Sequence, residues 1–319
     1  MDEKVYQPGE NYSQEQIPKD TRRSGKMKID NIFVAGAGLM GGGIAQVCAQ
    51  AGYSVVMRDL SDETLQKSME SINWSVGKLV EKGKVSGRVD EIIGRIEITT
   101  DLSAAEKADF VFEAIFENLE AKRSLFSELD KICPSHTIFG TNTSAIPVTE
   151  IATATKRIPL VIGTHFFSPV PMMKAVEIVK GLGTSGETAE IADSLCRSLG
   201  KETIRVNRDV AGIVLNRLNF PSTIEAIRLV EAGVATAEDI DKGMRLGFGR
   251  PMGPFETSDM AGLDVGYNAM MAVYEETKDK KFYPPMLLQR KVKLGHLGRK
   301  TGMGWYKYDS DGKKLGPAD

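Results

Sequence analysis

Proton transfer from an alcohol near neutral pH suits histidine, and the sequence contains three histidines. His165 ends the apolar run LVIGT, at the carboxyl end of an expected sheet strand, where open α/β sheets bind their ligands. Glu177 follows twelve positions later in KAVEIVK, where a charge among apolar neighbours needs a partner. A carboxylate on the far imidazole nitrogen would fix the tautomer and stabilise the imidazolium. The pair predicts a general base for alcohol oxidation. A structural histidine beside an edge-strand charge is the simpler alternative, and His136 and His296 are the other candidates for the base.

A glycine-rich turn supplies the second chemical feature. The β-rich run IFVAG ends at Gly36 and leads through Gly38, Leu39, Met40 and Gly41 into a helix. This is the order that a dinucleotide fingerprint requires. The first glycine permits a tight turn, the second lets the backbone approach a pyrophosphate, and the third lets helix and strand pack closely. The free N–H groups at the helix N-terminus then face negative charge. These residues are the expected core of a cofactor site.

An acidic residue about 20 positions after the glycine turn refines the choice of cofactor. Asp59 ends the run SVVMRD, where its carboxylate would accept hydrogen bonds from the adenosine ribose and repel a 2′-phosphate. This arrangement favours NAD. Arg58, its neighbour, could tolerate the phosphate, so NADP stays an alternative.

Short β-rich runs alternate with helical stretches over residues 27–210, which predicts a Rossmann-type, mainly parallel sheet covered by helices on both faces. Helices are expected to begin near Leu39, to run from Asp62 towards Lys82, and to cover 186–199. The expected strands are IFVAG, SVVMRD, IEITT, DFVFEAI, HTIFGTN, LVIGTHFF, KAVEIVKG and ETIRV.

After Gly212 no further strand is expected, so residues 211–319 are predicted to form an all-helical C-terminal domain for substrate binding and dimerisation. The run IVLNRLNFPSTIEAIRLVEAG predicts one long helix that Pro221 could bend. Thr236 is a plausible N-cap for the next helix. Two more helices are expected after Pro254 and Pro284.

Composition narrows the class of protein. The chain has 319 residues, 41% hydrophobic residues and a formal net charge of −2, which gives no general attraction to nucleic acid or anionic membranes. No apolar run reaches the length of about 20 residues that a membrane helix needs. Residues 1–26 are polar, lack the features of a targeting signal, and are expected to be a disordered leader. Three widely spaced cysteines, Cys48, Cys133 and Cys196, indicate buried apolar positions in a cytoplasmic protein, with neither disulfide nor metal site.

Seven segments in one order, spread over residues 28–308, resemble the 3-hydroxyacyl-CoA dehydrogenase family, and most closely its short bacterial 3-hydroxybutyryl-CoA dehydrogenases. They are GAGLMGGGIA, FEAIFENLEAKRSLF, TNTSAIP, HFFSPVPMMKAVEIV, NRLNFPSTIEAIRLVEAG, GRPMGPFETSDMAGLD and GRKTGMGWYKY. The resemblance implies NAD-dependent interconversion of an L-3-hydroxyacyl-CoA and its 3-keto thioester. It also implies a homodimer.

The resemblance assigns roles residue by residue. His165 and Glu177 match the catalytic pair, while Ser144 and Asn216 match residues that contact the reacting group. Both could donate hydrogen bonds to the C3 oxygen or the thioester carbonyl, where charge develops during ketone reduction. The residues assigned to the cofactor by resemblance are Glu117, Lys122 and Asn142.

Coenzyme A brings phosphates, and the resemblance assigns Ser75 and Lys82 to contacts with it. Two departures from the family pattern stand near the site. Ser168 replaces the usual asparagine after His-Phe-Phe, which leaves acyl-chain preference open, and Ala211-Gly212-Ile213 replaces Pro-Gly-Phe before the helix that carries Asn216.

Three other functions compete with this interpretation. Tyr274 and Lys278 have the spacing of a short-chain reductase pair, but they lie outside the dinucleotide-binding half and are interpreted as coincidence. A dehydrogenase of a free hydroxy or sugar acid could share the fold and His165. A non-catalytic dinucleotide-binding protein would need neither His165 nor Glu177.

Replacing Asp59 with Ser tests the cofactor assignment. The change removes a ribose acceptor and a like-charge barrier together, so NAD should bind more weakly and the gap to NADP should narrow. Binding of both nucleotides is measured by titration. A native protein that already prefers NADPH would contradict the assignment.

Overall fold

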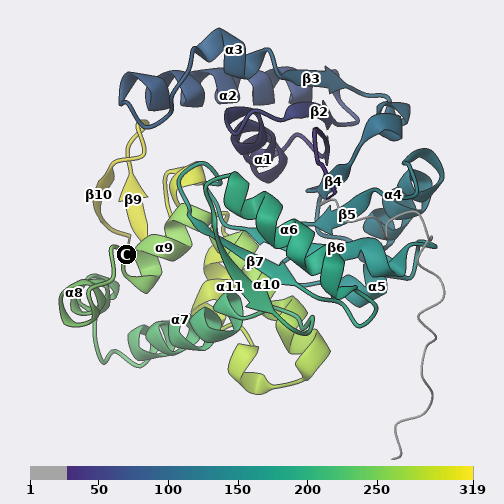
Figure 1. The fold of residues 1–319 in the computed structure, drawn as a ribbon. Helices are drawn as coiled ribbons and strands as arrows, with labels where there is room; N and C mark the ends of the chain where they lie inside the picture. Colours follow the sequence, from purple (N-terminus) through teal and green to yellow (C-terminus); the bar gives the residue numbers. More distant parts are fainter. Residues whose placement is uncertain (1–26, 319) are drawn as a thin grey trace, which may run out of the picture.

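One eight-stranded sheet organises the amino-terminal half of the chain. The computed structural model describes residues 27–318, and the sheet order is β3-β2-β1-β4-β5-β6-β7-β8 (Figure 1). The strands are β1 Asn31–Ala35, β2 Ser54–Arg58, β3 Ile96–Thr99, β4 Phe110–Glu113, β5 Ile138–Thr141, β6 Val161–Phe166, β7 Ala175–Val179 and β8 Glu202–Val206. Neighbouring strands are parallel except for β6 and β7, which pair antiparallel. The predicted, mainly parallel sheet is therefore confirmed.

Helices cover both faces of the sheet because its strand residues alternate between two apolar clusters. In β1, Ile32 and Val34 pack on one face and Phe33 and Ala35 on the other. The first face is covered by α1 Leu39–Gln50, α2 Asp62–Glu81 and α6 Gly186–Ser198, with α3 Val89–Ile93 beside them. The second face is covered by α4 Leu119–Ile132, α5 Val148–Ala152 and the short helix η3 Leu102–Lys107. This two-sided burial explains why the strands read as nearly continuous apolar runs.

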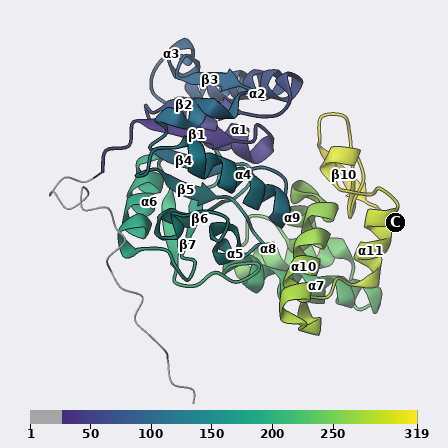
Figure 2. The same ribbon diagram turned by 90° about the vertical axis from the view of Figure 1, so that its right-hand side faces the viewer.

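The carboxyl-terminal half is mainly helical and lies to one side of the sheet (Figure 2). Its helices are α7 Leu215–Glu231, α8 Ala237–Phe248, α9 Pro254–Ala261, α10 Leu263–Thr277 and α11 Met286–Lys293. The helical prediction is confirmed, and the N-cap at Thr236 is confirmed by its bond from the Asp239 N–H (3.1 Å). The structure adds a short antiparallel hairpin, β9 Tyr306–Tyr308 with β10 Lys314–Pro317, that the prediction did not include.

Two details of the helical half differ from the prediction. The helix expected from Ile213 begins instead at Leu215, because Gly212 and Ile213 both have positive φ angles, 75° and 50°. Three helices rather than two follow Pro254, since Gly262 (φ 100°) separates α9 from α10. Three short 3₁₀ helices, η4 Ile158–Leu160, η5 Lys280–Phe282 and η6 Arg299–Thr301, complete the described elements.

Two buried aspartates join the hairpin to the helices. Asp241 of α8 accepts the N–H groups of Phe255 and Glu256 at the start of α9, and the hydroxyl of Tyr306 at 2.6 Å. Asp259 of α9 accepts the N–H groups of Trp305 and Tyr306. Burial raises the pKa of both aspartates above the ordinary value despite these hydrogen bonds. The hairpin is thus held by side-chain acceptors as well as by apolar packing.

The structure bears on the expectations about cysteines, membrane helices, metal sites and the leader. All three cysteines are free and buried, as expected for small apolar core residues. Over residues 27–318, no helix combines the length and apolar character of a membrane span. The same described residues contain no cluster of three or more His, Cys, Asp or Glu side chains that could hold a metal ion. The leader expected at residues 1–26 lies outside the described residues.

Glu256 gives a stability test for the helical half. Its carboxylate contacts Arg245 of α8 (2.6 Å) and Lys314 of β10, and it accepts the Gly253 N–H. Burial would raise the pKa of Glu256, but these partners outweigh it and lower the pKa from 4.5 to about 2. Because the folded-state pKa is depressed, the stabilisation is fully present above pH 4.5 and is lost as pH falls towards 2.

Glu256→Gln should therefore lower the free energy of unfolding at pH 7 by roughly 2–3 kcal/mol. The difference between the two proteins should shrink as pH falls from about 4.5. Denaturant unfolding at several pH values measures both, with the exposed Glu63→Gln as control. A pH-independent difference would show that Glu256 stabilises through packing alone.

Candidate active site

The antiparallel pairing of β6 and β7 brings His165 and Glu177 together. The two residues are direct partners in the strand register, and His165 Nδ1 lies 2.7 Å from Glu177 Oε2. Glu177 is fully buried and His165 is 6% exposed. Since Nδ1 faces the carboxylate, it carries the proton, and Nε2 keeps the lone pair that a base needs. The contact predicted from sequence is present in the structure.

The second oxygen of Glu177 reaches into the helical half. Glu177 Oε1 accepts the backbone N–H groups of Val214 (3.1 Å) and Leu215 (2.9 Å), which open helix α7. Helix N-termini favour negative charge because their first N–H groups have no partner within the helix. One carboxylate therefore orients the imidazole of His165 and holds the start of α7. Asn216, the next residue along, is half-buried on the first turn of this helix.

The loop after β5 places Ser144 in the same neighbourhood. The Asn142 side-chain oxygen accepts the Phe166 N–H at 2.8 Å, directly after His165 in β6. The carbonyl of Ser144 accepts the Gly212 N–H at 3.0 Å, where the chain enters the helical half. The ends of β5 and β6 and the start of α7 thus form one hydrogen-bonded unit. Asn142 serves this unit as a connector, while its predicted contact with the cofactor stays a prediction.

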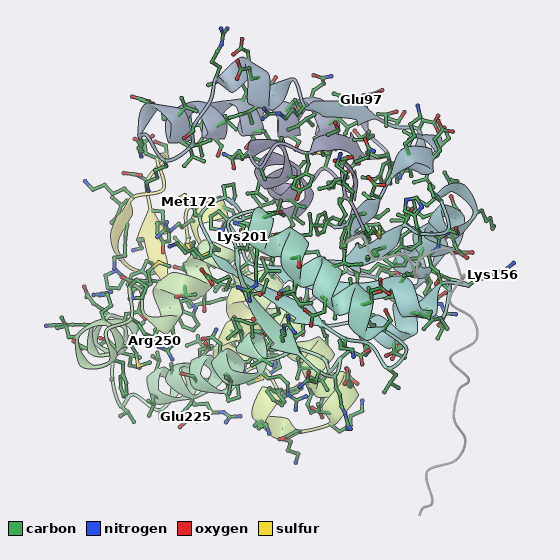
Figure 3. All side chains as sticks on the ribbon, in the orientation of Figure 1. Glu97, Lys156, Met172, Lys201, Glu225 and Arg250 are labelled. Atoms are coloured by element: carbon green, nitrogen blue, oxygen red, sulfur yellow. The ribbon has the colours of Figure 1, made fainter. Side chains whose placement is uncertain are left out.

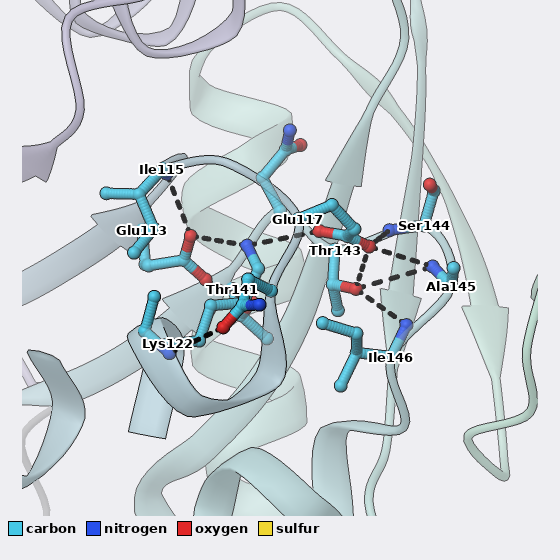
Figure 4. Close-up of polar contacts among 12 residues, drawn as sticks. Glu113, Ile115, Glu117, Lys122, Thr141, Thr143, Ser144, Ala145 and Ile146 are labelled. Carbon is cyan, nitrogen blue, oxygen red and sulfur yellow. Dashed lines mark hydrogen bonds and ion pairs between the residues drawn. The ribbon is translucent and has the colours of Figure 1, made fainter. Parts of the chain in front are cut away.

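A polar network joins Glu117 to the Ser144 loop (Figure 4). Glu117 accepts the hydroxyl of Thr143 and the N–H groups of Ser144 and Ala145, both at 3.1 Å. Burial would raise the pKa of Glu117, but Lys122 and these hydrogen bonds outweigh it and hold the pKa below its ordinary value. Because Glu117 occupies both N–H groups, a substrate oxygen here would have to use the Ser144 hydroxyl.

Lys122, assigned to the cofactor by resemblance to the family, is buried rather than open to a ligand. Its side chain is 1% exposed, and its ammonium lies 2.6 Å from Glu113 and 3.2 Å from Glu117. Glu117 is the more accessible partner, with 37% of its side chain exposed. A cofactor would meet Glu117 before Lys122.

The glycine turn has the shape that a dinucleotide requires. A side chain at Gly36 (φ 103°) would collide with the Ala114 carbonyl, and one at Gly41 would collide with the Gly36 carbonyl. A Cβ at Gly38 would meet no protein atom within 4 Å. Packing thus requires the first and third glycines, while the second leaves the N-terminus of α1 open for a pyrophosphate to approach. These residues fit NAD.

Asp59 lies beside this turn, at the end of β2. Its Oδ2 accepts the Ala37 N–H at 2.8 Å, and its Oδ1 accepts the Leu60 N–H at 2.8 Å. The carboxylate therefore fixes the glycine turn, and its predicted contact with a ribose hydroxyl stays a prediction. Leu39, the first residue of α1, is 77% exposed, and Met40 is half-buried against the core.

Two predicted substrate residues lie apart from this unit, on α2. Ser75 accepts a bond of 3.0 Å from the amide of Gln46, a buried residue of α1, so it ties the two helices together. Lys82 caps the carboxyl end of α2 and is exposed. The structure gives neither residue a contact with His165, and their role toward coenzyme A stays a prediction.

The other two histidines lie elsewhere. His136 precedes β5 and faces Asp109, which precedes β4, at 3.3 Å, so both stand at the amino edge of the sheet. His296 follows α11 in the helical half. Of the three histidines, His165 is the one placed at the carboxyl edge of the parallel strands, where ligands bind in open α/β sheets.

Sequence reasoning missed two residues that hold the site. Glu113, fully buried at the end of β4, anchors Lys122. Lys201 is 6% exposed and donates to the Val170 and Met173 carbonyls, which fixes the loop after His165; Figure 3 labels it beside Met172. A charge within the apolar run DFVFEAI was a usable signal for Glu113, the same signal that identified Glu177.

Three features describe this chain together: a glycine turn shaped for a dinucleotide, a histidine bound to a carboxylate at the same edge of the sheet, and a helical half that follows. They define the class of two-domain, nucleotide-dependent dehydrogenases. Two family models match the chain. The 3-hydroxyacyl-CoA dehydrogenase NAD binding domain covers residues 31–210, and the 3-hydroxyacyl-CoA dehydrogenase C-terminal domain covers residues 212–308. The chain belongs to the 3-hydroxyacyl-CoA dehydrogenase family. The predicted family and the predicted cofactor, NAD, are thereby confirmed.

Individual relatives agree over most of their length. A probable 3-hydroxybutyryl-CoA dehydrogenase of Bacillus subtilis is 45% identical over 284 residues, 89% of this chain and 99% of that protein. The mitochondrial hydroxyacyl-coenzyme A dehydrogenase of Mus musculus is 42% identical over 89% of this chain and 92% of its own. The crystal structure of (S)-3-hydroxybutyryl-CoA dehydrogenase from Ralstonia eutropha has a TM-score of 0.83 at 39% identity, covering 89% of this chain and all of that one.

Variants of the pair can separate the two contacts of Glu177. His165→Asn should lower NAD(H)-dependent turnover by about 10²–10⁴-fold, the usual contribution of a placed base, while NAD still binds. Glu177→Gln should lower turnover by about a hundredfold or more. It should also lower the free energy of unfolding by roughly 1–3 kcal/mol, because it weakens the acceptor for α7.

Turnover, NAD titration and denaturant unfolding measure these effects. If His165→Asn and Glu177→Gln have the same free energy of unfolding, the contact of Glu177 with α7 contributes nothing to stability. Near-normal turnover of His165→Asn would move the search for the base to His136 or His296.

Proposed function

We propose that the protein interconverts an L-3-hydroxyacyl-CoA, with 3-hydroxybutyryl-CoA the expected substrate, and its 3-keto thioester, using His165 and Glu177 as the acid/base pair. The observation that carries the proposal is the contact of 2.7 Å between His165 Nδ1 and Glu177, which leaves Nε2 for the substrate hydroxyl. NAD, when bound, accepts or supplies the hydride. His165 takes the proton from the C3 hydroxyl in oxidation and returns it in reduction.

The polar groups around His165 have distinct tasks in this scheme. The carboxylate of Glu177 stabilises the imidazolium that forms when His165 holds the proton. The Ser144 hydroxyl and the Asn216 amide donate to the C3 oxygen or the thioester carbonyl, where negative charge develops during reduction. In this scheme the site draws on both halves of the chain, because Ser144 follows β5 and His165 lies in β6, while Asn216 lies on α7.

The thioester part of the proposal rests on α2 and on the relatives. The relative from Bacillus subtilis and the Ralstonia eutropha structure are both named for 3-hydroxybutyryl-CoA. Lys82 is exposed at the end of α2, where a cation can meet a phosphate, and Ser75 lies two turns earlier on the same helix. Binding energy from such a remote nucleotide handle can position C3 for the reaction.

The division of labour between the two halves is part of the same proposal. Residues 27–210 form the NAD domain, and residues 211–319 complete the substrate site and form a homodimer. Large apolar side chains exposed on the helical half support the homodimer: Leu218, Leu246, Phe248 and Val265, each at least 54% exposed.

We assign the enzyme to the cytoplasm and to fatty acid or butanoate metabolism.

The test compares acetoacetyl-CoA with free acetoacetate by the decrease of NADH absorbance. The kcat/KM for the thioester should be larger by several orders of magnitude, since the free acid lacks the nucleotide handle. Part of that advantage should fall with added salt, because exposed charge pairs are screened over about 8–10 Å. Lys82→Ala should raise KM for the thioester and leave NAD affinity unchanged.

A matched control is Lys156→Ala, an exposed lysine that Figure 3 shows at a distant edge of the molecule. It should change neither constant. Equal efficiency on free acetoacetate or on a sugar acid would overturn the thioester proposal and leave the dehydrogenase assignment standing. Longer ketoacyl-CoA substrates, assayed in the same way, give the acyl-chain preference.

A further inference from the structure

A buried ion cluster joins β4 to the loop that carries Ser144. Glu113 and Lys122 are 0% and 1% exposed, and their ion pair measures 2.6 Å. Glu113 also accepts the Ile115 N–H (2.9 Å) and the hydroxyl of Thr141, its partner across the β4–β5 register. All the donors around this carboxylate come from residues at the carboxyl edge of the sheet or from α4.

Such a cluster is a poor way to gain stability. Removing two charges from water costs several kcal/mol per ion, and apolar residues of the same volume often stabilise a fold equally well or better. The cluster also holds two carboxylates, Glu113 and Glu117, against one ammonium. The buried charges are therefore explained better by a role in positioning neighbouring residues than by a contribution to the stability of the fold.

The cluster leads to Ser144 through an unbroken series of contacts. Lys122 contacts Glu117 at 3.2 Å through Oε2, which leaves Oε1 for the N–H groups of Ser144 and Ala145. The Ser144 carbonyl is fixed separately by the Gly212 N–H. The backbone of Ser144 is thus held on both sides, and the N–H side depends on where Lys122 places Glu117.

We propose that Glu113 is a positioning residue for Ser144, acting through Lys122 and Glu117. Because Glu113 takes one part of the Lys122 ammonium, Glu117 stays free to hold the Ser144 loop. The inference rests on the proposed function, in which the Ser144 hydroxyl contacts the substrate. Glu113 itself is 0% exposed, so we assign it no direct contact with substrate or cofactor.

Neutralising Glu113 has a predictable effect on the cluster. In Glu113→Gln, Lys122 keeps Glu117 as its single carboxylate partner and draws it away from the N–H groups of Ser144 and Ala145. The Ser144 N–H then loses its side-chain acceptor, and the Ser144 hydroxyl shifts. A displacement of about 1 Å at a reacting group can cost a hundredfold in rate.

A double-mutant cycle tests the proposal. Glu113→Gln should lower kcat/KM for acetoacetyl-CoA reduction by about tenfold to a hundredfold. In a Ser144→Ala background the same change should have an effect of less than about threefold, since the group being positioned is gone. Full additivity of the two substitutions would overturn the proposal.

Hydrogen exchange gives a readout that needs no turnover. The backbone amide of Ser144 should exchange about tenfold faster or more in Glu113→Gln than in the native enzyme, because its acceptor, Glu117, moves. The Ala145 amide should respond less, since it also donates to the Thr143 hydroxyl. Unchanged protection of the Ser144 amide would overturn the link from Glu113 to the loop. If the native enzyme does not reduce acetoacetyl-CoA, the proposed function fails, while the exchange result still decides that link.

Two further variants separate positioning from general loss of stability. Asp193→Asn removes another buried carboxylate, which contacts Thr203 and Arg205. Among the described residues, none of the hydrogen bonds of Asp193 involves the Ser144 loop. It should destabilise the protein and leave kcat/KM within about twofold. If Glu113→Gln does not fold, Thr141→Val removes one of the hydrogen bonds of Glu113 and should accelerate exchange at Ser144 in smaller measure. Acceleration by Asp193→Asn equal to that by either variant would overturn the proposal.

Discussion

The site depends on one buried carboxylate that must satisfy both of its oxygens. Glu177 has no access to water, so each oxygen needs a donor from the protein. The antiparallel register supplies the imidazole of His165, and the first turn of α7 supplies two backbone N–H groups. One carboxylate therefore fixes the start of α7 and orients the imidazole of His165 at the same time.

Other carboxylates at the carboxyl edge follow the same rule. Asp59 holds the glycine turn through the Ala37 N–H, and Glu117 holds the Ser144 loop through two N–H groups. Loops at the edge of a parallel sheet have backbone donors without ladder partners, and a fixed acidic side chain satisfies them. Most of the carboxylate oxygens at this edge therefore accept hydrogen bonds from the protein itself. What remains open is the N-terminus of α1, which suits the negative charge of a dinucleotide.

Much of this arrangement could be predicted from sequence, because it follows from local patterns. Short β-rich runs that alternate with helical stretches predicted the sheet and its helices. A glycine turn between a strand and a helix predicted the cofactor domain. The isolated charge at Glu177 gave the partner of His165. The antiparallel direction of β7 could not be derived, since an apolar run has the same pattern whichever way the strand is directed in the sheet. The same limit applies to Glu113, whose partner Lys122 lies on the following helix, and to the hairpin at Tyr306, whose short strands carry little periodic signal.

The three glycines of the cofactor turn are held by different constraints. Gly36 and Gly41 have backbone carbonyls where a side chain would lie, so the fold alone forbids any other residue there. Gly38 faces open space, and only a bound pyrophosphate gives a reason to keep it small. A descendant of this chain that kept the fold but stopped using a dinucleotide would retain the outer glycines and be free to replace the middle one. Position 38 therefore records, within the sequence itself, whether selection for the cofactor is still acting.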